Sequence, residues 1–340
     1  MKTLIFRTDR IGDFLISCPF ILSYKKKFKD NSIHIVSSEY NFNYIKNFKF
    51  IDNVLPLSIN SKFILKIFLL LKMIIFLRQS NYNDIIVLDG KKRSFFISLF
   101  LKGRKSILLQ SKNLELFSKI FNYKIVNNYE LQHQFKNISY LASILGFNIN
   151  HSEIDVYENY KFNNSIQISD KYVVIHLDEK WYTKYYYNDF TDINPNKEQL
   201  KNFINKIFYN LKGKYNLVLT TGSKQLDILN DYTKDFEKSS DNKSFKKKIE
   251  DKYIFYFNNN SFNDLELIIK NCSFLICCEG GISHAAHNFK IKTLAFFQKN
   301  RLQHTKFWTG HMKDLILYER KDMDYIINDD NFFNLMRKNL

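Results

Sequence analysis

The sequence predicts an α/β protein made of two Rossmann-like, doubly wound domains. In both halves of the chain, short apolar runs typical of buried strands alternate with longer segments typical of helices. The chain has 340 residues, more than the roughly 250–300 at which a single hydrophobic core stops growing. Residues 146–170 lose this periodicity and are rich in Asn, Ser and charged residues, so they are predicted to link the two domains.

The first half opens in the order strand, loop, helix, strand. We predict a strand at residues 3–6, a loop at residues 7–13 and a helix at residues 14–28. Three lysines near the end of that helix suit the negative end of the helix dipole. Later strands are predicted at residues 32–36, 54–57, 85–88 and 105–109, and a helix at residues 130–145. This alternation predicts one doubly wound sheet.

The most apolar segment, residues 63–77, is predicted to be a buried or half-buried helix. It is shorter than the roughly 20 residues that a membrane-spanning helix needs, and it contains Lys66 and Lys72. Its basic and aliphatic composition also suits a helix that lies on a bilayer surface.

The second half repeats the alternation of strands and helices. The predicted strands are residues 172–176, 217–220, 274–278 and 293–297, and the predicted helices are residues 197–211, 264–270 and 283–288. The lysine-rich residues 236–250 are interpreted as a surface loop. The segment from residue 323 onward is predicted to be helical and amphipathic, and packing of this last helix on the N-terminal domain stays open.

The formal net charge of +17 favours anionic partners, such as nucleic acid, an anionic membrane surface or phosphorylated small molecules. No nucleic-acid-binding module is recognisable, so nucleic acid is not a predicted partner. The four cysteines form no Cys-x-x-Cys pair, which argues against a zinc site or a disulfide framework. Reduced thiols and an N-terminus interrupted by charged residues predict a cytoplasmic protein.

Two consecutive glycines, Gly280 and Gly281, lie between a predicted strand and a predicted helix. Glycine lets the backbone approach a ligand closely, and a helix start offers N–H groups and positive dipole charge to a phosphate. His284 could donate to a phosphate oxygen, and Glu279 could accept from ribose hydroxyls. A simple strand–helix turn with a satisfied histidine explains the same residues equally well.

Four motifs, in order along the chain, resemble those of glycosyltransferase family 9, the heptosyltransferases and their relatives. Residues 4–15, LIFRTDRIGDFL, are similar to the family's first strand, its basic loop and the Gly-Asp that starts its first helix. Three further stretches match the family's Arg-Ser loop, its Gly turn and its Asp-(Ser/Thr)-Gly-x-x-His nucleotide motif, namely residues 89–94, 220–222 and 279–284. Glu279 and Gly280 depart from the last motif, because the family has Asp and then Ser or Thr there.

The resemblance implies the GT-B fold, in which two Rossmann-like domains face each other across a cleft. Residues 1–160 would bind the acceptor and residues 161–340 the nucleotide-sugar. Asp13 would be the general base, although an ordinary helix N-cap would also explain it. The implied donor-binding residues are Lys180 (or Lys184), Thr221, Gly222, Glu279, Gly280, Gly281 and His284, and the implied acceptor-binding residues are Arg10, Gly12, Lys91 and Arg93.

The implied function is inverting, metal-independent transfer of a sugar, without a cofactor. The first choice is heptose from ADP-heptose to a lipopolysaccharide or lipooligosaccharide core or a related glycolipid. An ADP-, UDP- or GDP-linked sugar of another kind stays open, as does a non-catalytic nucleotide-binding Rossmann protein. The anionic acceptor and the basic chain fit peripheral association with the cytoplasmic face of an anionic membrane.

Overall fold

The computed structural model divides the chain into two compact units. The first unit comprises Met1–Lys161 together with Lys306–His311, and the second comprises Phe162–Thr305 and Met312–Leu340. The residues described here are 1–58, 63–109, 112–127, 133–150, 154–158, 160, 162, 166, 168, 170–181, 196–223, 226–239 and 244–340.

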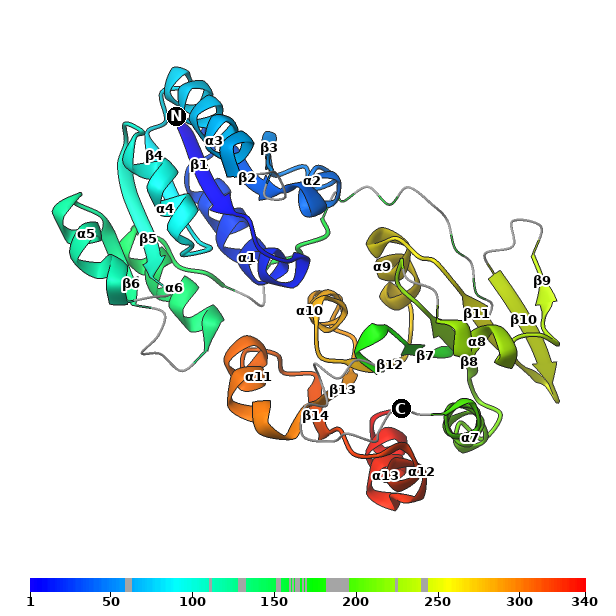
Figure 1. Cartoon of the computed structure of the whole chain (residues 1–340). Coiled ribbons are helices and arrows are strands. Elements are labelled where there is room, and N and C mark those ends of the chain that lie inside the picture. The colour runs from blue at the N-terminus through cyan, green and yellow to red at the C-terminus, as the bar shows by residue number, and fades with distance from the viewer. Residues whose placement is uncertain are drawn as a thin grey trace. The chain divides into compact units, whose positions relative to one another are not determined.

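The first unit contains a sheet of six parallel strands in the order β3-β2-β1-β4-β5-β6 (Figure 1). The strand order reverses between β1 and β4, and such a switch point is where open α/β sheets bind ligands. The strands are β1 (Lys2–Arg7), β2 (Ser32–Ser38), β3 (Asn53–Leu57), β4 (Asp84–Val87), β5 (Arg104–Leu109) and β6 (Lys124–Asn127). The doubly wound sheet predicted from the sequence is therefore confirmed.

Helices form two groups in the first unit. The helix α1 (Ile11–Lys27) packs against α6 (Gln134–Ile144), and its Phe14 ring contacts Tyr44 of α2 (Glu39–Ile45). A second group shares one hydrophobic core with β1 and β4, and it comprises α3 (Phe63–Gln79), α4 (Lys92–Leu99) and the turn η1 (Lys112–Leu114) that leads into α5 (Glu115–Ile120). Alternate residues of a strand point to opposite faces, so one sheet can serve both groups.

The helix α3 confirms the prediction of a half-buried helix. Ile74 and Leu77 are buried, whereas Phe68, Leu71 and Ile75 are exposed. Among the described residues, no helix is both long enough and apolar enough to cross a membrane.

The start of α1 corrects the predicted boundary. The sequence placed the helix start at Phe14, but the helix begins at Ile11 and Arg10 is the extended residue before it. The Arg10 N–H donates to the Asp13 carboxylate (3.1 Å to Oδ2), so the charged loop closes into a helical turn. Asp13 therefore lies at the third position of the helix and is not its N-cap.

The second unit contains a sheet of eight strands in the order β14-β13-β12-β7-β8-β11-β10-β9. The six strands from β14 to β11 are parallel and repeat the order of the first sheet, with the switch point between β7 and β12. The parallel strands are β7 (Tyr172–His176), β8 (Asn216–Thr220), β11 (Lys252–Phe257), β12 (Phe274–Cys278), β13 (Thr293–Phe297) and β14 (Leu315–Glu319).

The interpretation of residues 236–250 as a surface loop was wrong. This stretch contains β9 (Glu237–Lys238) and β10 (Ser244–Ile249), and β10 pairs antiparallel with β11. Phe245 stacks against Tyr256 of β11 (centroids 5.5 Å apart), while Lys246 and Lys248 alternate with it and are exposed. Lysines near the edge of a sheet resist pairing with another chain, and here they obscured the strand pattern in the sequence.

Two helices, rather than one, end the chain. The helix α12 (Met323–Asn328) stops at Asp329, whose side chain accepts from Asn331 N and starts α13 (Asp330–Asn339). The last helix, for which packing on the first domain was left open, contributes Phe332 and Met336 to the core of the second unit. The other helices of this half are η3 (Glu179–Trp181), α7 (Lys197–Asn210), α8 (Asp227–Tyr232), α9 (Phe262–Lys270), α10 (Gly281–Asn288), η5 (Lys299–Arg301) and α11 (Leu302–Thr309).

Candidate functional site

Each unit carries a group of polar residues at the carboxyl ends of its strands, at the switch point. In the first unit they follow β1 and β4, and we call them the β1–β4 cluster: Arg7, Thr8, Asp9, Asp13, Asp89, Lys91 and Arg93. In the second unit they follow β7 and β12, and we call them the β7–β12 site: Asp178, Lys180, Glu279, Gly280, Gly281 and His284. Both positions are those at which doubly wound sheets bind ligands.

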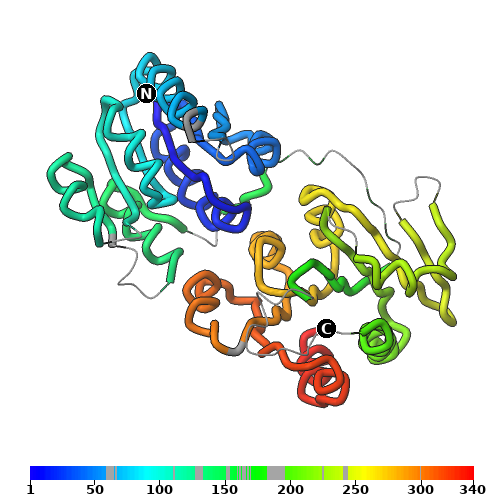
Figure 2. The backbone as a smooth tube through the Cα atoms, in the orientation of Figure 1, coloured from blue at the N-terminus to red at the C-terminus, as the bar shows by residue number. Residues whose placement is uncertain are grey.

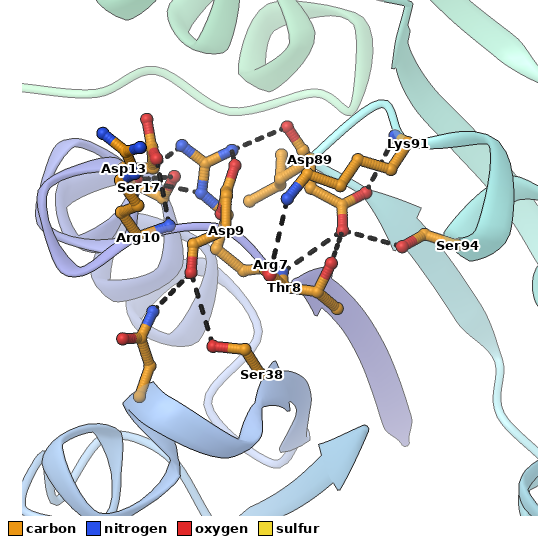
Figure 3. Close-up of polar contacts among 12 residues, drawn as sticks. Arg7, Thr8, Asp9, Arg10, Asp13, Ser17, Ser38, Asp89, Lys91 and Ser94 are labelled. Atoms are coloured by element: carbon orange, nitrogen blue, oxygen red, sulfur yellow. Dashed lines mark hydrogen bonds and ion pairs between the residues drawn. The ribbon is translucent and has the colours of Figure 1, made fainter. Parts of the chain in front are cut away.

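Arg7 holds the β1–β4 cluster together (Figure 3). Its side chain is fully buried, and Nη1 donates to the Leu88 carbonyl (2.8 Å) and pairs with Asp9 Oδ2 (3.2 Å). Nε and Nη2 donate to the Asp13 carbonyl (2.9 and 2.5 Å). One guanidinium therefore ties the ends of β1 and β4 to the first turn of α1.

The Asp13 carboxylate is fixed in direction by this arrangement. The residue is half-buried, Oδ2 accepts from the Arg10 N–H, and the backbone carbonyl accepts from Arg7 and from Ser17 Oγ (3.0 Å). A carboxylate held in one orientation at the rim of a sheet is suited to take a proton from a hydroxyl.

Asp9 is a member of the cluster that the sequence analysis missed. One oxygen of its buried carboxyl pairs with Arg7, and Oδ1 has no hydrogen-bond partner among the described residues. Burial raises the pKa of Asp9 to about 7; Arg7 and Lys91 oppose the shift, and Asp13 and Asp89 add to it. Its signal in the sequence was its place in Arg-Thr-Asp-Arg, directly after the first strand.

Asp89 organises the other side of the cluster. It is fully buried, and Oδ2 accepts from Thr8 N (3.2 Å), Thr8 Oγ1 (2.5 Å) and Ser94 Oγ (2.7 Å). Arg93 Nη2 donates to Thr8 Oγ1 (2.7 Å), and Lys91 Nζ lies 3.5 Å from the Thr8 carbonyl. Of the predicted acceptor residues, Lys91 and Arg93 are thus brought to the end of β1.

The other two predicted acceptor residues occupy different surroundings. The Arg10 residue is exposed, and Gly12 is buried within the first turn of α1.

Lys180 is the central residue of the β7–β12 site. It lies in η3, just after β7, and its Nζ donates to the Glu279 carbonyl (2.5 Å) and lies 3.9 Å from Asp178 Oδ2. Burial raises the pKa of Asp178 to about 6, against the opposing effect of Lys180. The alternative, Lys184, lies outside the described residues.

Gly280 gives Lys180 its room. A Cβ atom at Gly280 would lie 2.0 Å from Lys180 Nζ, so any other residue there would displace the ammonium group. Gly280 stands where the family motif has Ser or Thr, and the Lys180 ammonium occupies the space that such a side chain would need.

The turn containing Gly281 starts α10, two residues before the predicted start. Gly280 is the N-cap, its N–H donates to Ser283 Oγ (3.3 Å), and His284 is buried one turn into the helix. The first turn of a helix carries N–H groups with positive partial charge, next to the Lys180 ammonium.

The predicted donor residues Thr221 and Gly222 follow β8, the neighbour of β7. Thr221 is fully buried, its hydroxyl accepts from Asn259 N (3.2 Å), and its carbonyl accepts from Asn260 Nδ2 (2.8 Å). These contacts join the loops after β8 and β11. A Cβ atom at Gly222 would meet nothing within 4 Å, so the position is open.

His176 and Trp181 support η3 and were not predicted as functional. Trp181 is fully buried and its Nε1 donates to the His176 carbonyl (2.9 Å), which anchors the turn that carries Lys180. The His176 ring bonds Thr220 Oγ1 (3.0 Å). Burial, followed by the charge of Lys180, lowers the pKa of His176 to about 3, so the ring is neutral at physiological pH.

No group of three or more His, Cys, Asp or Glu side chains within the described ranges is arranged to hold a metal ion. The sequence contains one Asp-x-Asp, at Asp322 and Asp324, and Asp322 caps α12 by accepting from Tyr325 N (3.2 Å). The four cysteines all lie in described segments, where they are buried and form no disulfide.

Comparison with known proteins shows the fold. No protein-family model and no curated protein matches the sequence. Among solved structures, the E. coli heptosyltransferase WaaC with ADP matches with a TM-score of 0.73 at 14% identity, over 100% of both chains. A glycosyl transferase family 9 protein from Veillonella parvula matches with a TM-score of 0.64 at 13% identity, over 97% of this chain and 91% of that one.

The E. coli ADP-heptose lps heptosyltransferase II matches with a TM-score of 0.63 at 10% identity, over 99% of this chain and 100% of that one. The chain therefore has the two-unit GT-B fold of these family 9 heptosyltransferases, as the sequence resemblance implied.

Proposed function

We propose that a chain with the fold of the family 9 heptosyltransferases is itself an inverting, metal-independent glycosyltransferase. The observation that carries the proposal is the contrast between its two switch points. One presents an oriented carboxylate, Asp13, and the other presents an ammonium, Lys180, beside a glycine and a helix N-terminus. A base and an anion site are the two parts that sugar transfer from a nucleotide requires.

The donor belongs to the second unit in this proposal. The Lys180 ammonium and the N–H groups at the start of α10 would hold the diphosphate, and Glu279 would accept from the ribose. Three of the matched structures are described as ADP-bound, bound to an ADP-heptose analogue, or acting on ADP-heptose, which supports an ADP-linked sugar as the first choice. UDP- and GDP-linked sugars are the alternatives.

The reaction would begin at Asp13. The Asp13 carboxylate takes the proton of an acceptor hydroxyl while that oxygen forms a bond to the anomeric carbon of the donor. The bond between the anomeric carbon and the diphosphate oxygen breaks, and its electron pair leaves with the diphosphate. Lys180 compensates the charge that develops there, and attack opposite the leaving group inverts the anomeric centre.

The acceptor that we propose is an anionic glycolipid of the lipopolysaccharide-core type, reached at the surface of an anionic membrane. Lys91 and Arg93, at the end of β1, would pair with its acidic groups. The rival function is nucleotide binding without catalysis, which the second unit alone could perform.

Binding and turnover of a panel of nucleotide-sugars, measured in the presence of EDTA, tests the proposal. We expect a nucleoside diphosphate to bind and to raise the melting temperature. At a ligand concentration 100 times Kd, the free energy of unfolding should rise by about 2.7 kcal/mol. Binding that requires Mg²⁺ or Mn²⁺ would overturn the donor site. Binding without transfer to any glycolipid acceptor would favour the non-catalytic rival.

A further inference from the structure

Exposed apolar side chains are concentrated on three helices of the first unit. Of the 17 large hydrophobic side chains that are exposed in the described part of the chain, 12 lie on α3, α4 and α5 or on the residue after α4 and α5. Examples are Phe68 and Ile75 of α3, Phe96 of α4, and Phe117 and Ile120 of α5. We call the exposed side of these helices, drawn light blue to green in Figure 2, the outer face.

The three helices lie on one side of the first sheet. Residues of α3, α4 and η1, which leads into α5, share a single buried core with Leu4 and Phe6 of β1. Residues such as Phe68 and Ile75 point away from that core, with exposures of 62% and 61%. Exposed apolar side chains concentrated in this way mark a surface that another body covers.

The charge around the outer face shows which kind of body fits. Residues 63–124 contain 12 Lys or Arg and 3 Asp or Glu. Asp84 and Asp89 are buried, and the third acidic residue, Glu115, is paired with Lys119 (2.8 Å). The outer face is therefore apolar and positively charged, and a second copy of the same face would repel it.

We propose that the outer face docks on an anionic phospholipid bilayer. The Leu, Ile and Phe side chains enter the boundary below the headgroups, and the surrounding basic residues, such as Lys72, Arg78 and Lys119, lie among the lipid phosphates. Helices with an aliphatic and aromatic side flanked by lysines lie in the plane of an interface in this way.

The helix α4 connects the outer face to the β1–β4 cluster along the chain. The helix α4 starts at Lys92, directly after Lys91 of the cluster, and its eight residues span about 12 Å before Phe100. The inference deepens the proposed function, because a lipid-linked acceptor would reach the cluster from the docked membrane. It does not depend on catalysis and can fail separately.

Vesicle sedimentation of the full chain tests the docking surface. We expect binding to phosphatidylcholine vesicles that contain phosphatidylglycerol, weak binding to phosphatidylcholine alone, and weakening by salt, since the Debye length falls from about 10 Å at 0.1 M to about 3 Å at 1 M. The Phe68→Ser/Ile75→Ser variant should bind about tenfold more weakly. The Lys72→Glu/Arg78→Glu variant should lose the preference for phosphatidylglycerol.

The control is Tyr209→Ser/Tyr325→Ser, which removes the two large hydrophobic side chains that the described part of the second unit exposes. It should bind vesicles as the unmodified chain does, and all variants should keep the melting temperature because the altered side chains are exposed. Equal vesicle binding by the Phe68→Ser/Ile75→Ser variant and the unmodified chain would overturn the proposal. The proposal would also be overturned if the Phe68→Ser/Ile75→Ser variant were monomeric where the unmodified chain is dimeric, with vesicle binding unchanged. That result would assign the outer face to a second copy of the chain. Calorimetry of ADP without lipid reports separately on the donor site.

Discussion

The two units share one strand order and differ in what their switch points contain. In the first unit, Arg7 pairs with Asp9, and Asp89 accepts hydrogen bonds from the neutral N–H and hydroxyl groups of Thr8. In the second unit, a lysine lies against a glycine at the start of a helix. A shared topology therefore leaves the chemistry to a few residues at strand ends.

This difference suits two different ligands. A cluster that already holds its carboxylates with its own guanidinium, hydroxyl and N–H groups can orient a neutral hydroxyl beside one of them. A lysine beside a glycine and a helix N-terminus instead attracts an anion. The outer surfaces differ as well, because the described part of the second unit exposes two tyrosines where the first exposes the outer face.

The strongest test of the contrast is Asp13→Asn. The amide can still accept from the Arg10 N–H, so the helix start is kept, but it cannot take a proton. We expect the transfer rate to fall about 10²–10⁴-fold. Nucleotide affinity and melting temperature should stay unchanged, and an active, well-folded variant would remove Asp13 from the mechanism.

Arg7→Met and Lys180→Met compare the two units in stability. Removing Arg7 leaves Asp9 buried without its cation and the Leu88 carbonyl without the Arg7 donor, which should lower the free energy of unfolding by about 3–5 kcal/mol. Because the Lys180 side chain is 21% exposed, Lys180→Met should lower the free energy of unfolding much less. Denaturant unfolding measures both, and equal losses would contradict the description of the β1–β4 cluster as the more tightly coupled site.

Gly280→Ala should weaken nucleoside diphosphate binding by about tenfold, because the methyl group displaces Lys180 Nζ. Gly222→Ala tests the other predicted donor glycine: its methyl group meets no protein atom within 4 Å, so a loss of affinity there would indicate that the nucleotide lies against Gly222. In a double-mutant cycle, Gly280→Ala should add little to Lys180→Met, since both remove the same contact. Additive losses of affinity, measured by calorimetry, would show that Gly280 and Lys180 act on the nucleotide independently.

The two units should respond to pH in opposite directions. The pKa of Asp9 is raised to about 7, so its contribution to stability is present below pH 4 and is lost as the pH rises through 7. The pKa of His176 is lowered to about 3, so its contribution is present above pH 6.5 and is lost as the pH falls. For each of the two groups, the free energy of unfolding can change by up to about 1.4 kcal/mol per pH unit.

Hydrogen exchange resolves this prediction, because peptides from β1 and β7 report on separate units. Protection of β1 should fall from pH 5 to pH 8 after correction for the intrinsic exchange rate, and Asp9→Asn should abolish that fall. Parallel changes in β1 and β7 would show that one global event, rather than these two groups, sets the pH dependence.

Several elements were predictable because their signals are local. The strands β1, β4, β7 and β12 are apolar runs, and such runs form buried parallel strands wherever helices cover both faces. The strand β10, next to the two-residue edge strand β9, was missed because alternate lysines on its exposed side interrupt the apolar pattern. The start of α1 was placed too late because a single contact, from Arg10 N to Asp13, decides it.

The sequence by itself predicted the alternation of strands and helices and the division into two domains. Its resemblance to a known family identified Asp13 and Lys180 as candidate site residues. Only the tertiary structure decided which side chains meet. Lys180 bonds a carbonyl 99 residues away, and Thr8 bonds a carboxylate 81 residues away. Asp9 and His176 acquire their shifted pKa values from burial, and burial depends on how distant segments pack. The periodicity of a sequence reports local geometry. These contacts, and the burial of the groups that make them, exist only after the sheets and their helices have packed together.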